Sequence, residues 1–397
     1  MGYEPLTVAT VPGYVRGTAL MGAVFAKDEG LVADDLADGN VNLVFRVRSQ
    51  EEPARSVIVK QALPYARAVG AAFPMPLERI DLEQRMLTVE ARCAATAVPA
   101  LYHYDPDMHL MAIEDLTPHL IMREGLVRGI EYPHFAEQIG EFLAATLFHT
   151  SDLGVSSAEK KQLVKDFTNP RLTGVTEDLV FTEPFSNHPN NRWNPHLAPI
   201  VGSLWADGEL AAAVADLKLI FMTHAEALIH GDLHTGSLMV TPDETRVIDP
   251  EFGFVGPMAF DIGSLLGNLA LAYLAQDGHI SDPARRAAYR RWIAGAMERL
   301  WAVFRDEFRG RWNAQGPKWA PRAYQNRYFG RLLREAAGFA GVEMIRRLIG
   351  LAHAREVDRI GDEAERAVVE GKALTLARRW VVEREHMREM ADLLIGL

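Results

Sequence analysis

Residues 228–251, LIHGDLHTGSLMVTPDETRVIDPE, contain the pattern that decides the fold of this chain. The apolar start of this segment predicts a strand that leads into His230-Gly231-Asp232. A second short strand at 237–240, a Pro-Asp turn and a third strand ending at Asp249-Pro250-Glu251 are expected to follow. Asp232 and Asp249 lie about 17 residues apart in the sequence, and the hairpin is expected to bring them close together.

Two acidic groups at the ends of neighbouring strands suit phosphoryl transfer from ATP, in which one carboxylate orients the attacking hydroxyl and another binds the metal ion. Asp232 is the expected catalytic base, and Asp249 is the expected Mg²⁺ ligand. Glu251 is placed to share or bridge a metal, and hard oxygen ligands at this spacing favour Mg²⁺ over zinc. Ser237 stands where protein kinases carry a metal-binding Asn, so either Glu251 replaces that ligand or Ser237 acts through water.

Each half of this pattern also has a simpler explanation. His230 can be a buried histidine bonded to a backbone carbonyl, and Asp232 can be a turn residue. An Ile-Asp pair at the end of a strand is common, and short motifs often match by chance. The interpretation therefore depends on the joint pattern of helix, H-G-D, hairpin and D-P-E.

The composition is that of an ordinary soluble globular protein. The chain has 397 residues, which allows two or three domains, with 48% hydrophobic and 24% charged residues. Its formal net charge of −11 argues against nucleic acid or an anionic membrane surface as a partner. The single cysteine, Cys93, rules out an intramolecular disulfide and suits a reducing cytoplasm, where we expect the protein to act.

Membrane insertion is not expected from the sequence. The N-terminus lacks the basic start and apolar core of a signal peptide. The longest apolar run, residues 262–275, is too short to span a bilayer and predicts a buried helix instead.

The N-terminal region has the element order of a kinase N-terminal lobe. A turn at Asp38-Gly39-Asn40 precedes alternating apolar residues, and the next strand, 56–60, ends at Lys60. In kinases a lysine at this place contacts the α- and β-phosphates, whereas a solvated lysine at a strand end is the alternative. A helix over 77–93 is expected to supply Glu83 to hold this lysine, unless Glu83 faces solvent.

Two further features of this region concern the nucleotide. Asn42 follows the turn that stands in place of a glycine-rich lid, where it can bond a phosphate or the ribose, although an Asn near a turn needs no ligand. Two more strands, at 98–104 and 109–113, end at Glu114-Asp115-Leu116, which has the position and character of a hinge. Backbone groups there would bond the adenine edge.

We expect residues 1–115 to form a nucleotide-binding lobe of antiparallel sheet plus helix, and 116–397 a mainly helical lobe with the catalytic loop.

Beyond the hinge, helical periodicity dominates. The spacing predicts helices over 133–150, over 210–228, after the cap Ser281-Asp282-Pro283, over 323–353 and over 363–394. Residues 168–206 are rich in Asn, Pro and Trp, and we expect irregular structure there.

Arg346 and Arg347 lie in an apolar segment with small residues that looks buried. A buried arginine needs an anionic or multiply hydroxylated partner, such as a sugar diol or the transferred phosphoryl group. Surface solvation is the default alternative for such a pair. Adjacent residues on a helix point about 100° apart, so at most one of the two is expected to face a given cleft.

The chain resembles the methylthioribose kinase family in six segments that follow one another over residues 38–353. These segments are DGNVNLVFRV, VIVKQALPY, MAIEDL, HGDLHTGSLMV, RVIDPEFGFVGPMAFDIGSLLGNLALAY and GFAGVEMIRRLIGLAH. H-G-D with H-T-G-S and D-P-E separates this family from aminoglycoside and choline kinases, which usually carry Asn at position 237.

This resemblance implies a bilobal, protein-kinase-like α+β fold, a homodimer, and transfer of the ATP γ-phosphoryl group to the 1-hydroxyl of 5-methylthioribose in methionine salvage. Asp232 and Arg347 would contact the sugar, with Arg346 assisting. The implied ATP contacts are Asn42, Lys60, Glu114, Asp115, Leu116, Asp249, Pro250 and Glu251. Trp193, Trp205 and Phe252 are candidates for an apolar pocket around the methylthio group.

Two alternatives belong to other classes. A kinase of the same fold acting on an aminoglycoside, choline or homoserine would bind a cationic acceptor, which Arg346 and Arg347 would repel. A non-catalytic nucleotide-binding protein of this fold is the second, but every acidic group that the chemistry needs is present.

Overall fold

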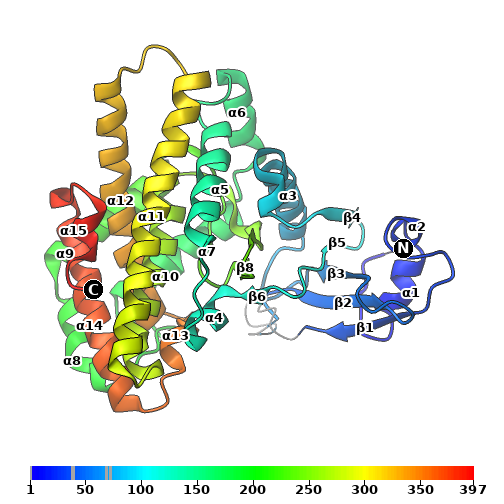
Figure 1. Cartoon of the computed structure of the whole chain (residues 1–397), viewed down its shortest axis with the longest axis horizontal. Helices are drawn as coiled ribbons and strands as arrows, with labels where there is room; N and C mark the ends of the chain where they lie inside the picture. The colour runs from blue at the N-terminus through cyan, green and yellow to red at the C-terminus, as the bar shows by residue number, and fades with distance from the viewer. Residues whose placement is uncertain (1, 37–40, 68–69, 71–73) are drawn as a thin grey trace. The chain divides into compact units, whose positions relative to one another are not determined.

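The computed structural model describes residues 2–36, 41–67, 70 and 74–397, so the predicted turn at Asp38-Gly39-Asn40 lies outside the described residues. The chain forms two compact units (Figure 1). The first comprises Met1–Pro118 with Ile248–Glu251, and the second comprises His119–Val247 with Phe252–Leu397. The predicted division into a nucleotide lobe and an acceptor lobe after residue 115 stays a prediction.

A five-stranded antiparallel sheet dominates the first unit, in the order β1-β2-β3-β5-β4. On β2, Phe45 and Val47 are buried and pair with Val59 and Val57 of β3, so this face of the sheet carries the core. Helices α1 and α2 cover that core with apolar residues. The bounds in this unit are α1 (Val11–Arg16), α2 (Leu20–Ala23), β1 (Leu31–Asp35), β2 (Leu43–Ser49), β3 (Ser56–Gln61), α3 (Arg79–Ala94), β4 (Leu101–Asp105) and β5 (Leu110–Glu114).

The second unit is mainly helical and contains two small antiparallel sheets, of order β6-β8-β9 and β10-β7. Its strands are β6 (Leu120–Ile121), β7 (Ala227–Ile229), β8 (Leu238–Val240), β9 (Thr245–Val247) and β10 (Phe254–Gly256). Its helices are α4 (Met122–Arg128), α5 (Phe135–His149), α6 (Ser157–Asp166), α7 (Pro170–Phe181), α8 (Ala198–Trp205), α9 (Gly208–Thr223), α10 (Met258–His279), α11 (Pro283–Gln315), α12 (Arg322–Ile349), α13 (Arg355–Asp358), α14 (Glu363–Val382) and α15 (Met390–Leu394). The predicted α+β class is confirmed.

Helices α10 and α12 pack closely in the core of the second unit. A Cβ at Gly263 or Gly267 of α10 would lie 2.5 or 2.6 Å from a carbonyl oxygen of Ala336 or Ala340 on α12. Any side chain at these two glycines would therefore push the helices apart. These contacts bring the two helix backbones together at residues 263–267 of α10 and 336–340 of α12.

The prediction of a buried helix at 262–275 is confirmed, although α10 is longer than that run. Among the described residues, α10 is long and apolar enough to cross a membrane, but 94% of its most apolar 18-residue window is buried inside the protein. Pro195–Trp205 together with α9 passes the same test, with a bend of 77° between the two parts.

Two expectations about the second unit were wrong. Residues 168–206 contain α7 and α8, each with a proline in its first turn, where the missing N–H costs no helical hydrogen bond. Burial of Leu172, Val180 and Phe181 shows that packing outweighed the unfavourable composition. The helix predicted over 210–228 ends at Thr223, and its last predicted residues belong to β7.

Candidate active site

Residues 230–237, called the catalytic loop because they include the expected base Asp232, follow β7 and are anchored to the start of α10. The backbone N–H groups of His230 and Gly231 donate to the two carboxylate oxygens of Asp261 at 2.7 and 2.9 Å. Gly231 has φ +81°, and a Cβ there would lie 2.3 Å from the carbonyl oxygen of Phe252, so only glycine fits. These contacts fix the backbone just before Asp232.

Asp261 was not among the expected site residues. Burial raises the pKa of Asp261, while the His230 side chain and the hydrogen bonds from the two backbone N–H groups oppose the rise. An aspartate in the first turn of an otherwise apolar helix, in MAFDIGSLLG, is the sequence signal that identifies it. Such a residue is buried only where it has a polar partner.

The Asp232 carboxylate lies among three basic side chains. Its Oδ1 is 3.4 Å from Nη2 of Arg346 and 3.7 Å from Nη2 of Arg347, and its Oδ2 is 3.4 Å from Nε2 of His234. Burial raises the pKa of Asp232, but His234, Arg347 and Arg346 lower it more, so the pKa lies well below its ordinary value. Asp232 is therefore a carboxylate suited to orienting a hydroxyl group.

The expectation that only one arginine of the pair faces the site was wrong. Arg346 and Arg347 leave α12 in different directions, but their side chains are long and both guanidinium groups reach the same oxygen of Asp232. A shared partner on α12 makes this convergence possible. Glu343 accepts from Nε of Arg346 at 2.6 Å and from Nε of Arg347 at 2.8 Å.

Glu343 was missed by the sequence analysis. Its side chain is 1% exposed, and Oε1 also accepts from Asn268 of α10 at 2.9 Å. Burial raises its pKa, but Arg346 and Arg347 lower it more, to about 2. The sequence signal that could have identified Glu343 is its spacing from Arg346 and Arg347, because positions i, i+3 and i+4 lie on one side of a helix.

Replacing Glu343 with Gln should destabilise the protein by about 3 kcal/mol at neutral pH, because two nearly buried arginines lose their carboxylate. The folded pKa of Glu343 is depressed, so this carboxylate stabilises the fold above pH 4.5 and loses that contribution as the pH falls toward about 2. The difference in unfolding free energy between wild type and E343Q should shrink over this range. Urea unfolding followed by circular dichroism from neutral to acidic pH measures it.

The exposed Glu141 on α5 supplies the matched control, since E141Q makes the same chemical change outside any buried ion pair. E141Q should leave the unfolding free energy within about 0.5 kcal/mol of wild type. An E343Q protein as stable as E141Q at neutral pH would show that Glu343 does not hold the arginine pair.

Ser237 supports the catalytic loop in this structure. Its hydroxyl donates to the backbone carbonyl of Asp232 at 2.8 Å. Thr235, in the same loop, donates to the buried carboxylate of Glu356 on α13. The role of Ser237 as a metal ligand through water stays a prediction.

Lys60 is the centre of a second polar cluster, which lies within the first unit. Its Nζ bonds the Glu83 carboxylate of α3 and lies 2.6 Å from Oδ1 of Asp249, so the expected contact between Lys60 and Glu83 is present. Burial lowers the pKa of Lys60, but Asp249, Glu83 and Glu251 raise it above its ordinary value. Burial raises the pKa of Glu83, and Lys60 opposes that rise. Lys60 is thus held as a cation.

Arg79 links Asn42 to Glu251 in the same cluster. The Oδ1 of Asn42 accepts from Nη2 of Arg79 at 2.7 Å, and its Nδ2 donates to Oε2 of Glu251 at 3.3 Å. Nε of Arg79 lies 3.7 Å from that Glu251 oxygen. Arg79 is 2% exposed and was missed, because an arginine in the charged segment LERIDLEQ resembles a surface residue.

The donor set of this cluster fits a hard divalent cation. Glu83, Asp249 and Glu251 bring three carboxylates against the two cations Lys60 and Arg79. Burial raises the pKa of Glu251 and the neighbouring Asp249 charge adds to the rise, whereas Lys60 and Arg79 lower the pKa without cancelling the rise. A bound cation would reduce the remaining repulsion between the two carboxylates. The side chain of Asp249 is 47% exposed and accessible to such an ion.

Asp249 itself has an unusual backbone conformation, with φ +64°. Residues other than glycine rarely adopt this left-handed region, although Asp and Asn do so more readily than most. Strained residues of this kind concentrate at functional sites.

The side chain of Asp115 in the expected hinge is committed to structural contacts. It lies 2.8 Å from Nε of Arg46 and accepts from the Ser56 hydroxyl at 2.7 Å. Glu114 accepts from the N–H of Ala100, and Leu116 is buried. These side chains fix the backbone, which agrees with a hinge whose residue identities matter less than its backbone placement; adenine binding there stays a prediction.

Of the predicted aromatics, Trp193 and Trp205 contact each other edge to face with ring centroids 5.3 Å apart. The N–H of Arg192 donates to the carbonyl of Ile349, which places Trp193 beside the end of α12 that carries Arg346 and Arg347. Phe252 approaches Gly231 through its carbonyl oxygen. Their role in binding a methylthio group stays a prediction.

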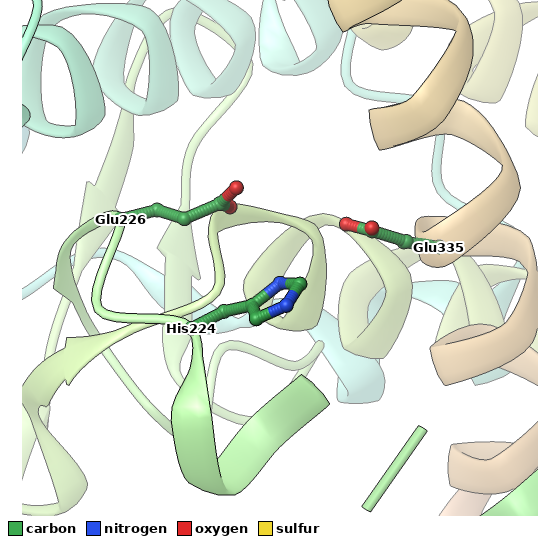
Figure 2. Close-up of side chains that lie close together, drawn as sticks. All are labelled: His224, Glu226 and Glu335. Carbon is green, nitrogen blue, oxygen red and sulfur yellow. The ribbon is translucent and has the colours of Figure 1, made fainter. Parts of the chain in front are cut away.

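His224, Glu226 and Glu335 form another group of potential metal ligands, with ligand atoms within 4.8 Å of one another (Figure 2). Arg331 binds both carboxylates, with Nη2 2.5 Å from Glu226 and Nη1 2.9 Å from Glu335. Because this guanidinium group already binds both carboxylates, we assign the cluster to structural cross-linking between α12 and the segment before β7.

The sequence of this chain is similar to those of known phosphotransferases. The phosphotransferase enzyme family (APH) matches residues 34–306. The methylthioribose kinase of Escherichia coli O45:K1 is 44% identical to this chain, covering 98% of this chain and 96% of its own length. The chain belongs to the methylthioribose kinase family.

Methylthioribose kinase 1 of Oryza sativa subsp. japonica, another member of this family, is 38% identical and covers 99% of this chain and 95% of its own length. Among solved structures, a choline kinase from Cryptosporidium parvum matches with a TM-score of 0.53 and 11% identity, covering 98% of this chain and all of that chain. That similarity shows the fold alone. The family resemblance expected from the six sequence segments is confirmed.

Proposed function

We propose that this protein transfers the γ-phosphoryl group of ATP to the 1-hydroxyl of 5-methylthioribose, giving the sugar 1-phosphate and ADP in methionine salvage. The full-length similarity to methylthioribose kinases supports the substrate. The observation that carries the chemistry is Asp232, ionised and held among Arg346, Arg347 and His234.

A carboxylate with a depressed pKa is a weak base, and the proposed acceptor suits it. The anomeric hydroxyl of a reducing sugar is more acidic than an ordinary alcohol, so little basicity is needed to receive its proton. In phosphoryl transfer, positioning and electrostatic stabilisation supply most of the catalysis. Arg346 and Arg347 are placed to stabilise negative charge on the transferred group or to bond the sugar diol.

For ATP, we propose contacts from Asn42, Lys60, the backbone of Glu114–Leu116, and Asp249-Pro250-Glu251. Lys60 would bond the phosphates, since Glu83 and Asp249 hold it as a buried cation. Asp249 and Glu251 would bind Mg²⁺, which would supply positive charge against the phosphates. Residues 1–115 would then form the nucleotide lobe, and 116–397 the sugar lobe.

We also propose a cytoplasmic homodimer, following the family resemblance and the single cysteine. Light scattering coupled to gel filtration measures the mass in solution, for which a dimer of the 44.1 kDa chain is expected. A monomer at all accessible concentrations would contradict the dimer without affecting the proposed reaction.

Incubation of the purified protein with Mg-ATP and methylthioribose should yield ADP and an anomeric phosphate ester. A coupled assay of ADP release gives the rate, and ³¹P NMR shows coupling of the new phosphorus to the anomeric proton. The same assay with choline, homoserine and an aminoglycoside tests the related kinases. Faster turnover of any of these than of methylthioribose would contradict the proposed acceptor, and absence of ATP turnover with every acceptor would indicate a non-catalytic protein.

A further inference from the structure

His234 lies two residues after Asp232, and its side chain is 11% exposed. Its Nδ1 accepts the backbone N–H of Gly236 at 2.8 Å. Because a backbone N–H can only donate, Nδ1 carries no proton in this arrangement, and the neutral ring carries its proton on Nε2. That nitrogen is the one that lies 3.4 Å from Oδ2 of Asp232.

The surroundings of His234 favour the uncharged ring. Burial lowers its pKa, and Arg347 and Arg123 lower it further, whereas Asp232 opposes them, so the pKa lies below the ordinary value for histidine. A second proton would also have to enter at Nδ1, where it would face the N–H of Gly236. The backbone geometry and the neighbouring charges thus both favour the neutral ring with its proton on Nε2.

The loop backbone at Gly236 is itself held in place. The guanidinium group of Arg123 lies against it, since a Cβ at Gly236 would be 1.6 Å from Nη2 of Arg123. The N–H of Arg123 donates to the carbonyl of Thr235 at 3.1 Å. The group that orients the His234 ring is therefore fixed by α4.

The two oxygens of Asp232 face different partners. Oδ1 faces Arg346 and Arg347, and Oδ2 faces His234. Rotation of the carboxylate about its Cβ–Cγ bond would disturb both sets of contacts. Each carboxylate oxygen has two lone pairs, so Oδ2 can accept from His234 and from a substrate hydroxyl at the same time.

We propose that His234 is a positioning residue for phosphoryl transfer, whose neutral imidazole donates Nε2–H to Asp232 and fixes the plane of its carboxylate toward the acceptor hydroxyl. This inference rests on the proposed function, in which Asp232 receives that hydroxyl's proton. The acceptor oxygen forms its bond to the γ-phosphorus as the bond to the β,γ-bridging oxygen breaks, and ADP leaves with that electron pair. The hydroxyl proton passes to Asp232, and His234 keeps its own proton throughout.

Two substitutions of His234 by an amide side chain test whether a hydrogen-bond donor is needed at the position of Nε2. In H234Q the longer side chain can place an amide N–H near the position of Nε2, whereas in H234N the amide reaches only the region of Nδ1. We expect H234N to lower kcat by about 10- to 100-fold, by analogy with the loss of activity when a partner that orients a metal ligand is removed. H234Q should recover much of that loss, and both variants should keep the wild-type KM for ATP.

Equal losses of kcat in the two variants would overturn the proposal, as would wild-type kcat in H234N. A rise in the KM for ATP with kcat unchanged would also overturn it, because His234 would then affect nucleotide binding and not the orientation of Asp232. A direct readout does not depend on any variant's activity. In wild-type protein labelled with [¹⁵N]histidine, the His234 signals, assigned by their absence in H234Q, should show a protonated Nε2 and an unprotonated Nδ1 at neutral pH.

A His234 ring protonated at Nδ1, or doubly protonated at neutral pH, would overturn the proposal even if both variants had lost their activity. The wild-type assay separates this failure from failure of the proposed function. If the wild type uses a different acceptor from the panel, methylthioribose is excluded as its substrate, and the two variants are compared on the acceptor that it uses. If the wild type turns over no acceptor, both proposals fail.

Discussion

Asp232→Asn should lower kcat with methylthioribose by roughly 10²–10⁴-fold, the range supplied by a positioned group that accepts a proton. The amide has the same size and its oxygen can still accept from Arg346 or Arg347, so the fold should persist. It cannot take the proton of the acceptor hydroxyl. ATP affinity, measured by calorimetry, should stay close to wild type, because the proposed nucleotide contacts lie at other residues.

The exposed Asp243, in the turn between β8 and β9, gives a matched control, and D243N should keep wild-type kcat. A D232N enzyme that turns over at the wild-type rate would remove Asp232 from its assigned role. Loss of ATP binding in D232N would instead indicate that the substitution disturbs more than the acceptor group.

Asp249→Asn is expected to lower kcat by a comparable factor, because it removes a proposed ligand of the metal ion. Loss of one carboxylate ligand should lower kcat by about 10²–10³-fold, as for other groups that stabilise transition-state charge, and should raise the Mg²⁺ concentration required for activity. Asn tolerates the positive φ of this position, and Lys60 keeps Glu83 as a partner, so the local structure should survive. Rates at fixed ATP over a range of free Mg²⁺ measure the change.

Binding experiments separate the ligand role of Asp249 from its contact with Lys60. D249N should weaken binding of Mg-ATP more than binding of ATP measured in the presence of a chelator. Equal weakening of both would assign the effect to Lys60, and an unchanged Mg²⁺ requirement would show that Asp249 is not a metal ligand. D243N, in the turn of the hairpin that precedes Asp249, again serves as the control.

Local sequence pattern predicted the parts of the site that depend on neighbouring residues. The strand ending at Lys60 and the helix carrying Glu83 were both foreseen, because alternation and helical spacing decide which way each residue faces. The H-G-D loop was foreseen for the same reason, as the stretch between two short strands.

Residues whose role depends on tertiary contacts were harder to foresee. Arg79 lies in a charged segment and Glu343 in an apolar one, and only the fold shows that they are 2% and 1% exposed and which groups they bind. The convergence of Arg346 and Arg347 depends on Glu343 and on the length of the two side chains, neither of which helix geometry alone reveals. Helix α7 forms although the composition of its segment is unfavourable for a helix, because its apolar residues are buried in the core.

The close contact between α10 and α12 constrains how the acceptor range of this protein can change during evolution. Helix α10 carries Asp261, which anchors the catalytic loop, and α12 carries Glu343 with its two arginines. With Gly263 and Gly267 pressed against α12, a substitution that shifts either helix would move these charged groups together. New specificities should therefore arise in segments outside this helix pair, such as that around Trp193, leaving the α10–α12 pair unchanged across enzymes with different acceptors.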